Sequence, residues 1–484
     1  MPSHFDVVII GAGLSGIGAA WRLRESHPGK TYVILEARDA IGGTWDLFRY
    51  PGVRSDSDMF TLSYPFRPWR EAESIAPGDK IRRYIEETAA EAGIDRHIRF
   101  RSKVVSAQWS SATAQWTLEI ADGTTITAGF VYACAGYYSY DGGYQPQFPG
   151  AAGFAGQIVH PQFWPDDLPY AGRKVVVIGS GATAVTLVPA MAATAAHVTM
   201  LQRSPTYMTV LPGRDVIADG LRRLLPARLA NRLVRGKNIL LTQGFYQLAR
   251  RRPSAVRKLL RSVAVKALGD PAYVDEHFTP SYEPWDQRLC VLPSGDLYAA
   301  VRAGRASVVT DHIDRFEPAG IRLRSGRLLE ADVVVSATGL SLLPAGGLRL
   351  TVDGDEVALG EKAAYRGLML SGVPNFAYCV GYTNASWTLR ADLSHRYVVK
   401  LLRHMDRHGY AVATPEYRGQ AGRPLIDLSS GYVQRALPLF PRQGDRDPWL
   451  VRQNYLRDVV ATPRADVTQD MTFSRTPSTV EAAR

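Results

Sequence analysis

Two segments of the chain repeat the same order of apolar and small residues. Each begins with an apolar run, passes through a glycine-rich loop and continues as small and apolar residues, FDVVIIGAGLSGIGAA at 5–20 and RKVVVIGSGATAVTLV at 173–188. A second apolar strand with a small-residue end follows each copy, VYACAG at 131–136 and VVVSATG at 333–339. Strands that alternate with helices in this way predict parallel sheets. We therefore expect an α/β protein with two doubly wound, Rossmann-like dinucleotide-binding domains.

The pattern changes between these elements. Residues 215–277 show Leu/Arg-rich helical periodicity, interrupted by Pro226 and Pro253, which predicts a helical insertion. After Gly339 the chain returns through a strand and then a long helix, which would complete the first domain. The predicted units are 1–150 for the first part of the first domain, 151–172 for a linker, 173–338 for the second domain with its insertion at about 215–277, 339–441 for the second part of the first domain, and 442–484 for a C-terminal tail that wraps the surface.

The first glycine loop has the spacing of a dinucleotide site. Gly11, Gly13 and Gly16 form G-x-G-x-x-G directly after a strand, where missing side chains let a pyrophosphate approach backbone N–H groups at a helix N-terminus. The next strand ends in Glu36, 25 residues after Gly11, the position of a carboxylate that accepts from a ribose hydroxyl. An acid there suits an unphosphorylated ribose, so this site is predicted to hold FAD.

The second loop differs in a way that predicts a different cofactor. Gly179 and Gly181 recur with Ala184 in the third position, but the following strand ends in Gln202-Arg203 in place of an acid. A guanidinium binds a 2′-phosphate, which a carboxylate would repel. The second site is therefore predicted to hold NADPH, with Arg203 and Thr183 as candidate contacts.

The amino-acid composition narrows the class of protein. The chain has 484 residues, of which 46% are hydrophobic and 21% charged, as in ordinary globular enzymes. Its three cysteines, Cys134, Cys290 and Cys379, form no CxxC pair, which disfavours a disulfide reductase and predicts no metal site and a reducing, cytoplasmic location. No apolar run approaches the roughly 18 to 20 residues of a membrane span, and the N-terminal segment, with Asp6 and four glycines, is expected to be a strand, loop and helix and no signal peptide.

The charge is concentrated in one segment. The chain carries a net charge of +11, while residues 219–268 hold thirteen Lys and Arg against Asp219 alone, a local charge of +12. Two interpretations stay open for this cationic, amphipathic insertion: a solvated cap over the substrate entrance, or a peripheral contact with anionic membrane. Nucleic-acid binding is disfavoured because the stretch has no nucleic-acid motif.

A further motif lies between the two domains. Phe154, Gly156, His160 and Trp164 fit F-x-G-x-x-x-H-x-x-x-W, and this pattern resembles that of the type I Baeyer–Villiger monooxygenases, which are class B flavoprotein monooxygenases. The related flavin-containing monooxygenases carry Tyr or Phe where Trp164 stands. The two readings of the motif are direct chemistry and hinge packing between domains.

The resemblance extends from about residue 4 to about 460 and is similar in detail to the bacterial ethionamide-activating monooxygenase subgroup. It rests on GGTWDLFRYPGVRSDSDM, GSGATAV, LQRSPTY, WDQRLC and GYTNASWT. It implies an FAD- and NADPH-dependent oxidoreductase that uses O₂ and a C4a-peroxyflavin to convert small apolar ketones to esters or lactones, and that also oxygenates sulfides and thioamides.

The resemblance also assigns residues. It places the active-site arginine at Arg288 and the carboxylate that orients it at Asp56, which also contacts cofactor. Several relatives have Lys just before this arginine, where this chain has Gln287, so the 2′-phosphate preference is left to Arg203. Four further cofactor contacts are expected near the flavin, Thr44, Trp45, Asn384 and Trp387. For Trp45 and Trp387 the alternative, packing in the protein core, stays open. Either Ser386 or Asn384 is expected to cap the helix that starts near Trp387.

Two alternatives remain open at this stage. One is an S- or N-oxygenating flavin-containing monooxygenase, which Trp164 disfavours. The other is a flavin-binding membrane-surface protein whose NADPH oxidation is incidental, suggested only by the basic insertion.

Overall fold

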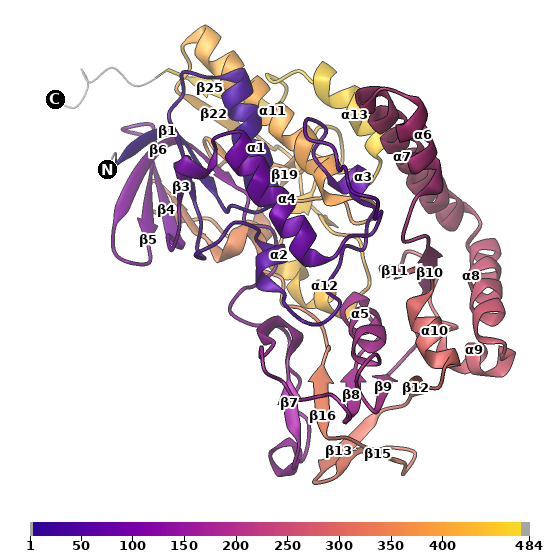
Figure 1. Ribbon diagram of the computed structural model, residues 1–484. Helices are drawn as coiled ribbons and strands as arrows, with labels where there is room; N and C mark the ends of the chain where they lie inside the picture. The colour runs from indigo at the N-terminus through magenta and orange to yellow at the C-terminus, as the bar shows by residue number, and fades with distance from the viewer. Residues whose placement is uncertain (1–2, 476–484) are drawn as a thin grey trace.

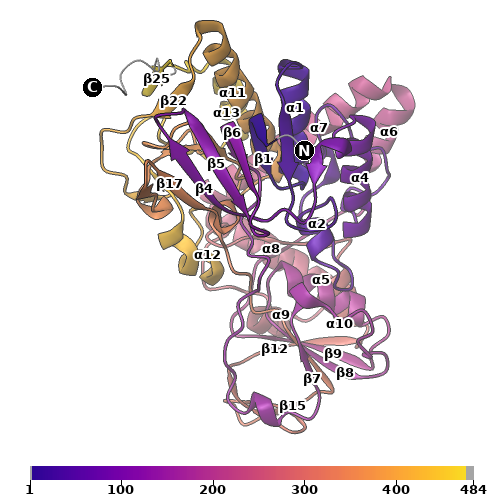
Figure 2. The same ribbon diagram turned by 90° about the vertical axis from the view of Figure 1, so that its left-hand side faces the viewer.

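The computed structural model describes residues 3–475, which form two α/β domains with a helical layer along one side (Figures 1 and 2). The larger domain is built on a mixed sheet whose parallel centre is β6–β1–β2–β3. Its strands are, in spatial order, β18 (Asp355–Glu356), β17 (Arg349–Val352), β4 (Val104–Ser110), β5 (Gln115–Ile120), β6 (Thr125–Ala133), β1 (His4–Ile10), β2 (Tyr32–Leu35) and β3 (Ile98–Arg99), with β19 (Ala364–Tyr365), β20 (Met369–Leu370) and β21 (Phe376–Tyr378) joined through β6.

The central strand β1 is buried on both faces because its side chains alternate between two cores. Val7 and Ile9 pack with helix side chains on one face, and Val8 and Ile10 pack on the other face. Helices on the first face are α1 (Leu14–Ser26), α4 (Gly78–Glu91) and α11 (Trp387–His408); the short helices α2 (Thr44–Leu47) and α3 (Met59–Leu62) lie in the loop after β2.

The smaller domain has a parallel sheet in the order β12–β9–β8–β16–β7. Its bounds are β12 (Ala306–Thr310), β9 (His197–Gln202), β8 (Lys174–Ile178), β16 (Val333–Ser336) and β7 (Gln157–Val159). Helices α5 (Ala182–Met191) and α10 (Asp296–Arg302) pack on one face, and the antiparallel β13 (Ile313–Glu317), β14 (Gly320–Leu323) and β15 (Leu328–Glu330) pack on the other. The predicted fold class of two dinucleotide-binding α/β domains is confirmed.

The Leu/Arg-rich segment forms four helices, α6 (Val216–Leu224), α7 (Ala227–Arg251), α8 (Pro253–Leu268) and α9 (Pro271–His277). The two prolines mark helix starts, because proline fits the first turn of a helix but breaks its interior: α7 begins after Pro226 and α8 begins at Pro253. The Asp215 carboxylate accepts from two N–H groups at the start of α6 and caps it. Flanking strands β10 (Met208–Leu211) and β11 (Cys290–Pro293) pair in parallel.

The C-terminal region is more ordered than the sequence suggested. A surface-wrapping tail was expected from residue 442, but the chain forms β24 (Arg442–Gln443), α13 (Tyr455–Arg464) and β25 (Met471–Ser474). Strand β24 pairs with β23 (Arg423–Pro424), β25 pairs with β22 (Val412–Pro415), and α13 packs on α11; a short helix, α12 (Gly431–Ala436), precedes them. Trp449 is fully buried, and its indole N–H donates to Asp470 at 2.7 Å. Residues 476–484 of the expected tail lie outside the described part of the chain. Within residues 3–475, none of the helices combines the length and the apolar character that crossing a bilayer requires.

Candidate active site

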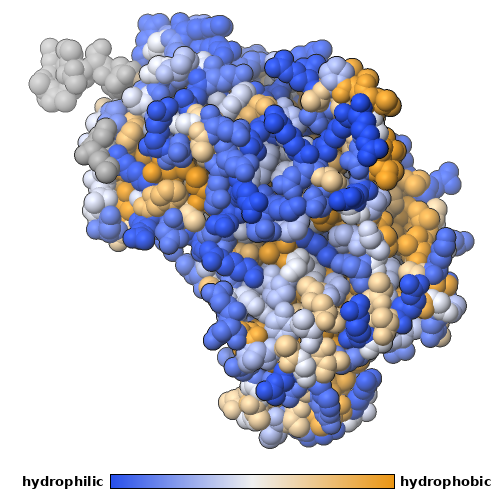
Figure 3. Space-filling view, in the orientation of Figure 1, coloured by the Kyte–Doolittle hydropathy of each residue, from blue (hydrophilic) through white to orange (hydrophobic). Residues whose placement is uncertain are grey.

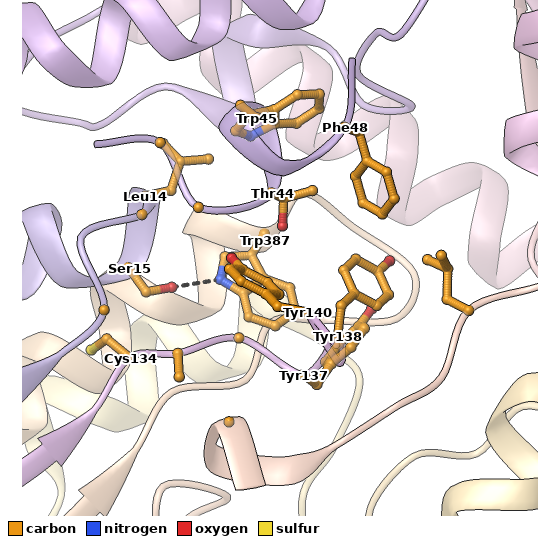
Figure 4. A pocket seen from close by; sticks show the side chains of 18 of the residues that line it. Leu14, Ser15, Thr44, Trp45, Phe48, Cys134, Tyr137, Tyr138, Tyr140 and Trp387 are labelled. Carbon is orange, nitrogen blue, oxygen red and sulfur yellow. Dashed lines mark hydrogen bonds between the residues drawn. The ribbon is translucent and has the colours of Figure 1, made fainter. Parts of the chain in front are cut away.

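One large cavity lies where the two domains meet, and it brings together residues that the sequence analysis selected from both. The cavity and its solvent-open mouth enclose about 2040 Å³ free of protein atoms. Of the selected residues, those that line it are Gly11, Gly13, Glu36, Thr44, Trp45, Asp56, Thr183, Arg288 and Trp387. Figure 4 shows part of this wall, with the aromatic rings of Phe48, Tyr137, Tyr138 and Trp387 around the space.

The first glycine loop leaves open space that side chains at its glycine positions would occupy. Gly11 has φ +100°, and a Cβ there would lie 2.9 Å from the Cys134 carbonyl oxygen. A Cβ at Gly16 would lie 1.8 Å from the Gly11 carbonyl oxygen. Helix α1 begins after Gly13 with no side-chain cap, so its first N–H groups are open to an anionic acceptor. These features fit a dinucleotide pyrophosphate.

Glu36 lies at the end of β2, beside this loop. It is buried, and its two carboxylate oxygens accept from the backbone N–H of Ala12 at 2.7 Å and of Arg38 at 2.9 Å. Burial raises the pKa of Glu36, and the two N–H donors oppose that shift. Each carboxylate oxygen has a second lone pair, so both backbone bonds leave room for a ribose hydroxyl from the cavity side.

The second glycine loop leads into α5, whose first turn lines the same cavity from the smaller domain, while Gly179 and Gly181 are not among the lining residues. Gly179 has φ +133°, and a Cβ there would lie 2.3 Å from the Ala337 carbonyl oxygen. Gly181 precedes α5 without a side-chain cap, Thr183 in its first turn lines the cavity, and Ala184 is fully buried against the sheet. The two loops therefore present two helix N-termini towards one space.

Arg203 lies just past the end of β9, on the surface of the smaller domain. It is exposed and makes no hydrogen bond or ion pair within residues 3–475. Its guanidinium is therefore available for a ligand at the second loop. Gln287, the departure noted in the sequence, is half-buried next to Arg288.

Arg288 and Asp56 meet at the wall of the cavity although 232 positions separate them in the chain. Arg288 precedes β11 and Asp56 follows α2, and their Nη2 and Oδ2 atoms are 2.8 Å apart. The side chains are 28% and 35% exposed, so both remain reachable from the cavity. Asp56 raises the pKa of the Arg288 guanidinium above its usual range, against the opposing effect of burial. A permanent positive charge therefore faces the cavity.

The loop that carries Arg288 is held in an uncommon conformation. Trp285 has φ +73°, a conformation that bulky residues rarely adopt without support. Hydrogen bonds to the next residue, Asp286, stabilise this conformation. The Asp286 carboxylate accepts from Arg250 Nη1 of α7 at 2.9 Å, and the Asp286 carbonyl accepts from the N–H of Ser429 at 2.8 Å. The Glu283 N–H also donates to the Asp286 carboxylate, at 3.2 Å. The insertion and the larger domain thus fix this loop from two sides.

Sequence reasoning missed an aromatic cluster that walls the cavity. Tyr137, Tyr138 and Tyr140 follow β6, and Tyr137 meets Trp387 edge-on with ring centroids 5.0 Å apart. Burial raises the pKa of the Tyr138 hydroxyl well above its ordinary value, so this ring is neutral at physiological pH. The sequence GYYSY, directly after the small-residue end of the strand, was the signal for this aromatic cluster.

Trp387 occupies the first turn of α11, and the indole N–H donates to Ser15 Oγ at 2.7 Å (Figure 4). The expected side-chain cap of this helix is wrong. Ser386 stands at the N-cap position without capping, because its hydroxyl instead meets the Thr61 hydroxyl. Asn384 is buried and donates to the Gln453 carbonyl at 2.8 Å. The N–H groups at the start of α11 therefore have no side-chain acceptor.

The F-x-G-x-x-x-H-x-x-x-W motif surrounds β7, the edge strand of the smaller domain's sheet, and contributes no residue to the cavity wall within the described chain. Phe154 packs edge-on against Phe316 at 5.8 Å, and Trp164 packs against Tyr170 at 6.4 Å. A Cβ at Gly156 would lie 2.2 Å from the Asp332 carbonyl oxygen. These contacts pack the motif within the smaller domain.

His160 lies against Gly143, in the segment that leaves the larger domain after β6. Its Nδ1 accepts from the Gln162 N–H at 3.2 Å, and a Cβ added at Gly143 would lie only 2.2 Å from its ring. Burial lowers the pKa of His160, so the ring is neutral at physiological pH. A neutral histidine packed in this way suits a structural role.

Comparisons with known proteins agree with this site. Residues 5–214 match the family model described as flavin-binding monooxygenase-like. The chain is 51% identical, over 99% of its own length and all of the relative's, to the FAD-containing monooxygenase EthA of Mycobacterium tuberculosis (strain ATCC 25618 / H37Rv). Two solved structures share the fold. A steroid monooxygenase bound to NADP has a TM-score of 0.77 and 22% identity, with 98% of this chain and 100% of that chain covered. An ε-caprolactone-bound cyclohexanone monooxygenase has a TM-score of 0.75 and 21% identity, with 97% of this chain and 100% of that chain covered.

The level of identity to EthA, taken over the whole chain, decides between the classes that the sequence left open. This identity sets aside a flavin-binding surface protein whose NADPH oxidation is only incidental. The chain belongs to the family of FAD-containing monooxygenases.

Proposed function

We propose that this enzyme is an FAD- and NADPH-dependent Baeyer–Villiger monooxygenase, which inserts one oxygen atom of O₂ next to the carbonyl of a ketone to give an ester or lactone. The observation that carries the proposal is the Arg288–Asp56 pair in the wall of a cavity that the first glycine loop and the first turn of α5 also line. The solved cyclohexanone monooxygenase of the same fold holds ε-caprolactone, a lactone, which supports the substrate class.

Each cofactor has a set of residues that suits it. FAD would lie along the Gly11–Gly16 loop with its ribose at Glu36 and its ring system near Thr44, Trp45 and Trp387. NADPH would lie along the second loop, at Gly179, Gly181 and Thr183, with its 2′-phosphate at Arg203. Together the two cofactors supply hydride transfer and the activation of O₂.

Arg288 has the role of fixed electrostatic support. Oxygen insertion into a ketone develops negative charge on the oxidant and on the substrate oxygen, and a preorganised cation lowers the energy of that charge. Asp56 holds the guanidinium by one ion pair at 2.8 Å and leaves the remaining N–H donors to the cavity. Asp56 therefore acts by positioning Arg288.

The aromatic wall supports two further features of the proposal. Phe48, Tyr137 and Trp387 offer apolar surface to a small apolar ketone, and closing such a wall around it excludes water from the reacting centre. The same surface accepts a thioether or thioamide, so sulfur oxygenation accompanies ketone oxygenation in this proposal. The S- or N-oxygenating alternative predicts sulfur or nitrogen products alone.

We propose the cytoplasm as the compartment. The support is the state of Cys134, Cys290 and Cys379, which are free thiols in the folded chain and buried.

The test of the proposal is Arg288→Ala in the FAD-loaded enzyme. Removing one preorganised donor of this kind costs roughly 10²- to 10³-fold in kcat, so ester formation from a ketone should fall by that factor while flavin reduction by NADPH under anaerobic conditions stays near the wild-type rate. Arg302→Ala, an exposed arginine on α10, is the matched control and should retain both activities. Unchanged ester formation in Arg288→Ala would refute the role of this residue.

A further inference from the structure

The outer faces of α6, α7 and α8 expose apolar side chains to an unusual degree. Of the large apolar residues that are exposed within residues 3–475, nine lie between 216 and 259. They are Val216, Ile217, Leu224, Leu229, Leu233, Leu240, Leu241, Leu248 and Leu259, which we call the apolar insertion surface. Figure 3 shows hydrophobic colour gathered along the right-hand edge, where Figure 1 places these helices. Leu224 is 83% exposed and Leu241 is 63% exposed.

Folding does not require these exposed side chains, because other residues of α7 anchor it. Arg235 donates from Nη1 to the carbonyl oxygens of Phe60 and Ser63, at 2.8 and 2.9 Å. Asn238 donates to the Asp58 carboxylate at 2.9 Å, and Ile239 packs in a small core with neighbouring helix residues. The apolar insertion surface lies outside these contacts and has no partner within the described chain.

The same helices carry free positive charge. Of the thirteen Lys and Arg in 219–268, four form ion pairs and two bond to backbone carbonyls. The remaining seven are exposed and make no hydrogen bond or ion pair within residues 3–475: Arg223, Arg228, Arg232, Arg251, Arg252, Lys258 and Lys266. They therefore keep their charge available for an anionic partner.

We propose that the apolar insertion surface and its seven free cations dock the enzyme on an anionic lipid bilayer as a peripheral, interfacial contact. Exposed leucines on helices that lie along a bilayer enter the boundary between headgroups and acyl chains, and lysine and arginine beside them are attracted to the anionic headgroups. A nucleic acid would use the cations but would leave the leucines exposed to water. The combination of both features selects a lipid surface.

Docking there would place the cavity close to the bilayer. Ile239, on the buried side of α7, packs against Tyr382, and Tyr382 lines the cavity. One helix thus has one face towards the membrane and its opposite face towards the site. Apolar substrates dissolved in the bilayer would reach the enzyme without crossing bulk water.

The experiment is flotation of the FAD-loaded enzyme with vesicles of equimolar phosphatidylcholine and phosphatidylglycerol, compared with vesicles of phosphatidylcholine alone. We expect binding to the anionic vesicles that is lost in about 1 M salt, where the screening length falls to about 3 Å. Arg251→Glu/Arg252→Glu should lower the binding constant at least about tenfold, and Leu240→Glu should lower it independently. All of these positions are exposed, so the variants should fold and retain bound flavin.

The controls make the same changes elsewhere on the surface. Arg302→Glu/Arg305→Glu alters the charge equally on α10 and at its end, and Leu439→Glu replaces an exposed leucine outside the insertion; both should bind vesicles like the wild type. Binding of the wild type at background level would overturn the proposal. Equal losses of vesicle binding in the test and control variants would also overturn it. A concentration-dependent dimer that Leu240→Glu dissociates, with no binding to vesicles, would instead assign the surface to a second copy of this chain.

Discussion

At the scale of single residues, Arg203 is the side chain that we propose sets the cofactor preference. It stands exposed past the end of β9, on the domain that carries the second glycine loop, and it has no partner within residues 3–475. A charge-assisted hydrogen bond contributes about 1.5 to 3 kcal/mol, which corresponds to roughly a tenfold to hundredfold preference. We therefore propose that the preference for NADPH over NADH depends on this guanidinium.

Arg203→Ala tests that assignment. We expect kcat/KM for NADPH to fall roughly ten- to hundredfold, while kcat/KM for NADH stays within about twofold, since NADH lacks the phosphate. Steady-state kinetics with both cofactors measures the ratio, and Arg302→Ala serves as the exposed-arginine control. An unchanged ratio would assign the 2′-phosphate to another residue.

His395 is the residue whose titration should affect stability most clearly. It is buried in α11, where its Nδ1 lies 2.8 Å from the Tyr132 hydroxyl. Burial lowers the pKa of His395 to about 3, with Asp392 raising it and Arg22 lowering it. The unfolded state therefore binds the proton more tightly between pH 3 and 6.5, so the contribution of His395 to stability is complete above pH 6.5 and is lost as pH falls towards 3.

The variant His395→Asn removes this titration but keeps a polar partner for Tyr132. Between pH 7 and about pH 5, the wild type should lose about 2 kcal/mol more free energy of unfolding than the variant does. Denaturant unfolding at both pH values measures the difference. His312→Asn, at an exposed position, should retain the wild-type pH dependence. Identical pH dependence in wild type and His395→Asn would contradict the assignment.

At the scale of elements, the loop between α9 and β11 links the insertion to the site. Asp286 accepts from Arg250 of α7 and from the Glu283 N–H, and its carbonyl accepts from Ser429 of the larger domain. These bonds fix the loop, and so they hold the Arg288 side chain, two residues later, beside Asp56. Asp286 is therefore a positioning residue, since a displacement of about 1 Å at a reacting centre can cost about a hundredfold in rate.

Asp286→Ala should change product formation more than cofactor binding. We expect kcat for oxygenation to fall roughly ten- to hundredfold, with more NADPH consumed per product and KM for NADPH nearly unchanged. Asp286→Asn, which keeps an acceptor for the Glu283 N–H, should recover part of the loss. Arg261→Ala breaks a comparable ion pair with Asp275 away from this loop and should leave coupling intact. A loss of thermal stability without a change in coupling would indicate a purely structural role.

The elements also show what sequence could predict. Gly11 and Gly179 followed from local spacing, because a glycine loop between a strand and a helix has one structural meaning. The contact of Arg288 with Asp56 came from family resemblance, and no spacing rule could supply it. The tyrosines after β6 were missed, because aromatic residues at a strand end pack in a core as often as they face a cavity. Ser386 was misassigned because its hydroxyl had a tertiary partner, Thr61, that sequence does not reveal.

At the scale of the whole molecule, the discontinuous larger domain is the feature that builds the site. The chain leaves it after β6, forms the smaller domain and the insertion, and returns through β21 and α11 to the same sheet. Trp387 of the returning segment therefore bonds Ser15 of the first segment, and both residues line the cavity. The C-terminal order, with Trp449 fully buried, also depends on this return and has no local sequence signal.

The central claim is that this whole assembly inserts oxygen into ketones. The most direct measurement incubates the purified flavoprotein with NADPH, ¹⁸O₂ and a panel of one alkyl ketone, one aryl ketone and one thioether, and compares product masses with NADPH consumed. We predict an ester that carries one heavy oxygen, formed in proportion to NADPH, together with labelled sulfoxide. Label in the sulfoxide alone, with both ketones unchanged, would contradict the Baeyer–Villiger assignment and favour an S-oxygenating monooxygenase.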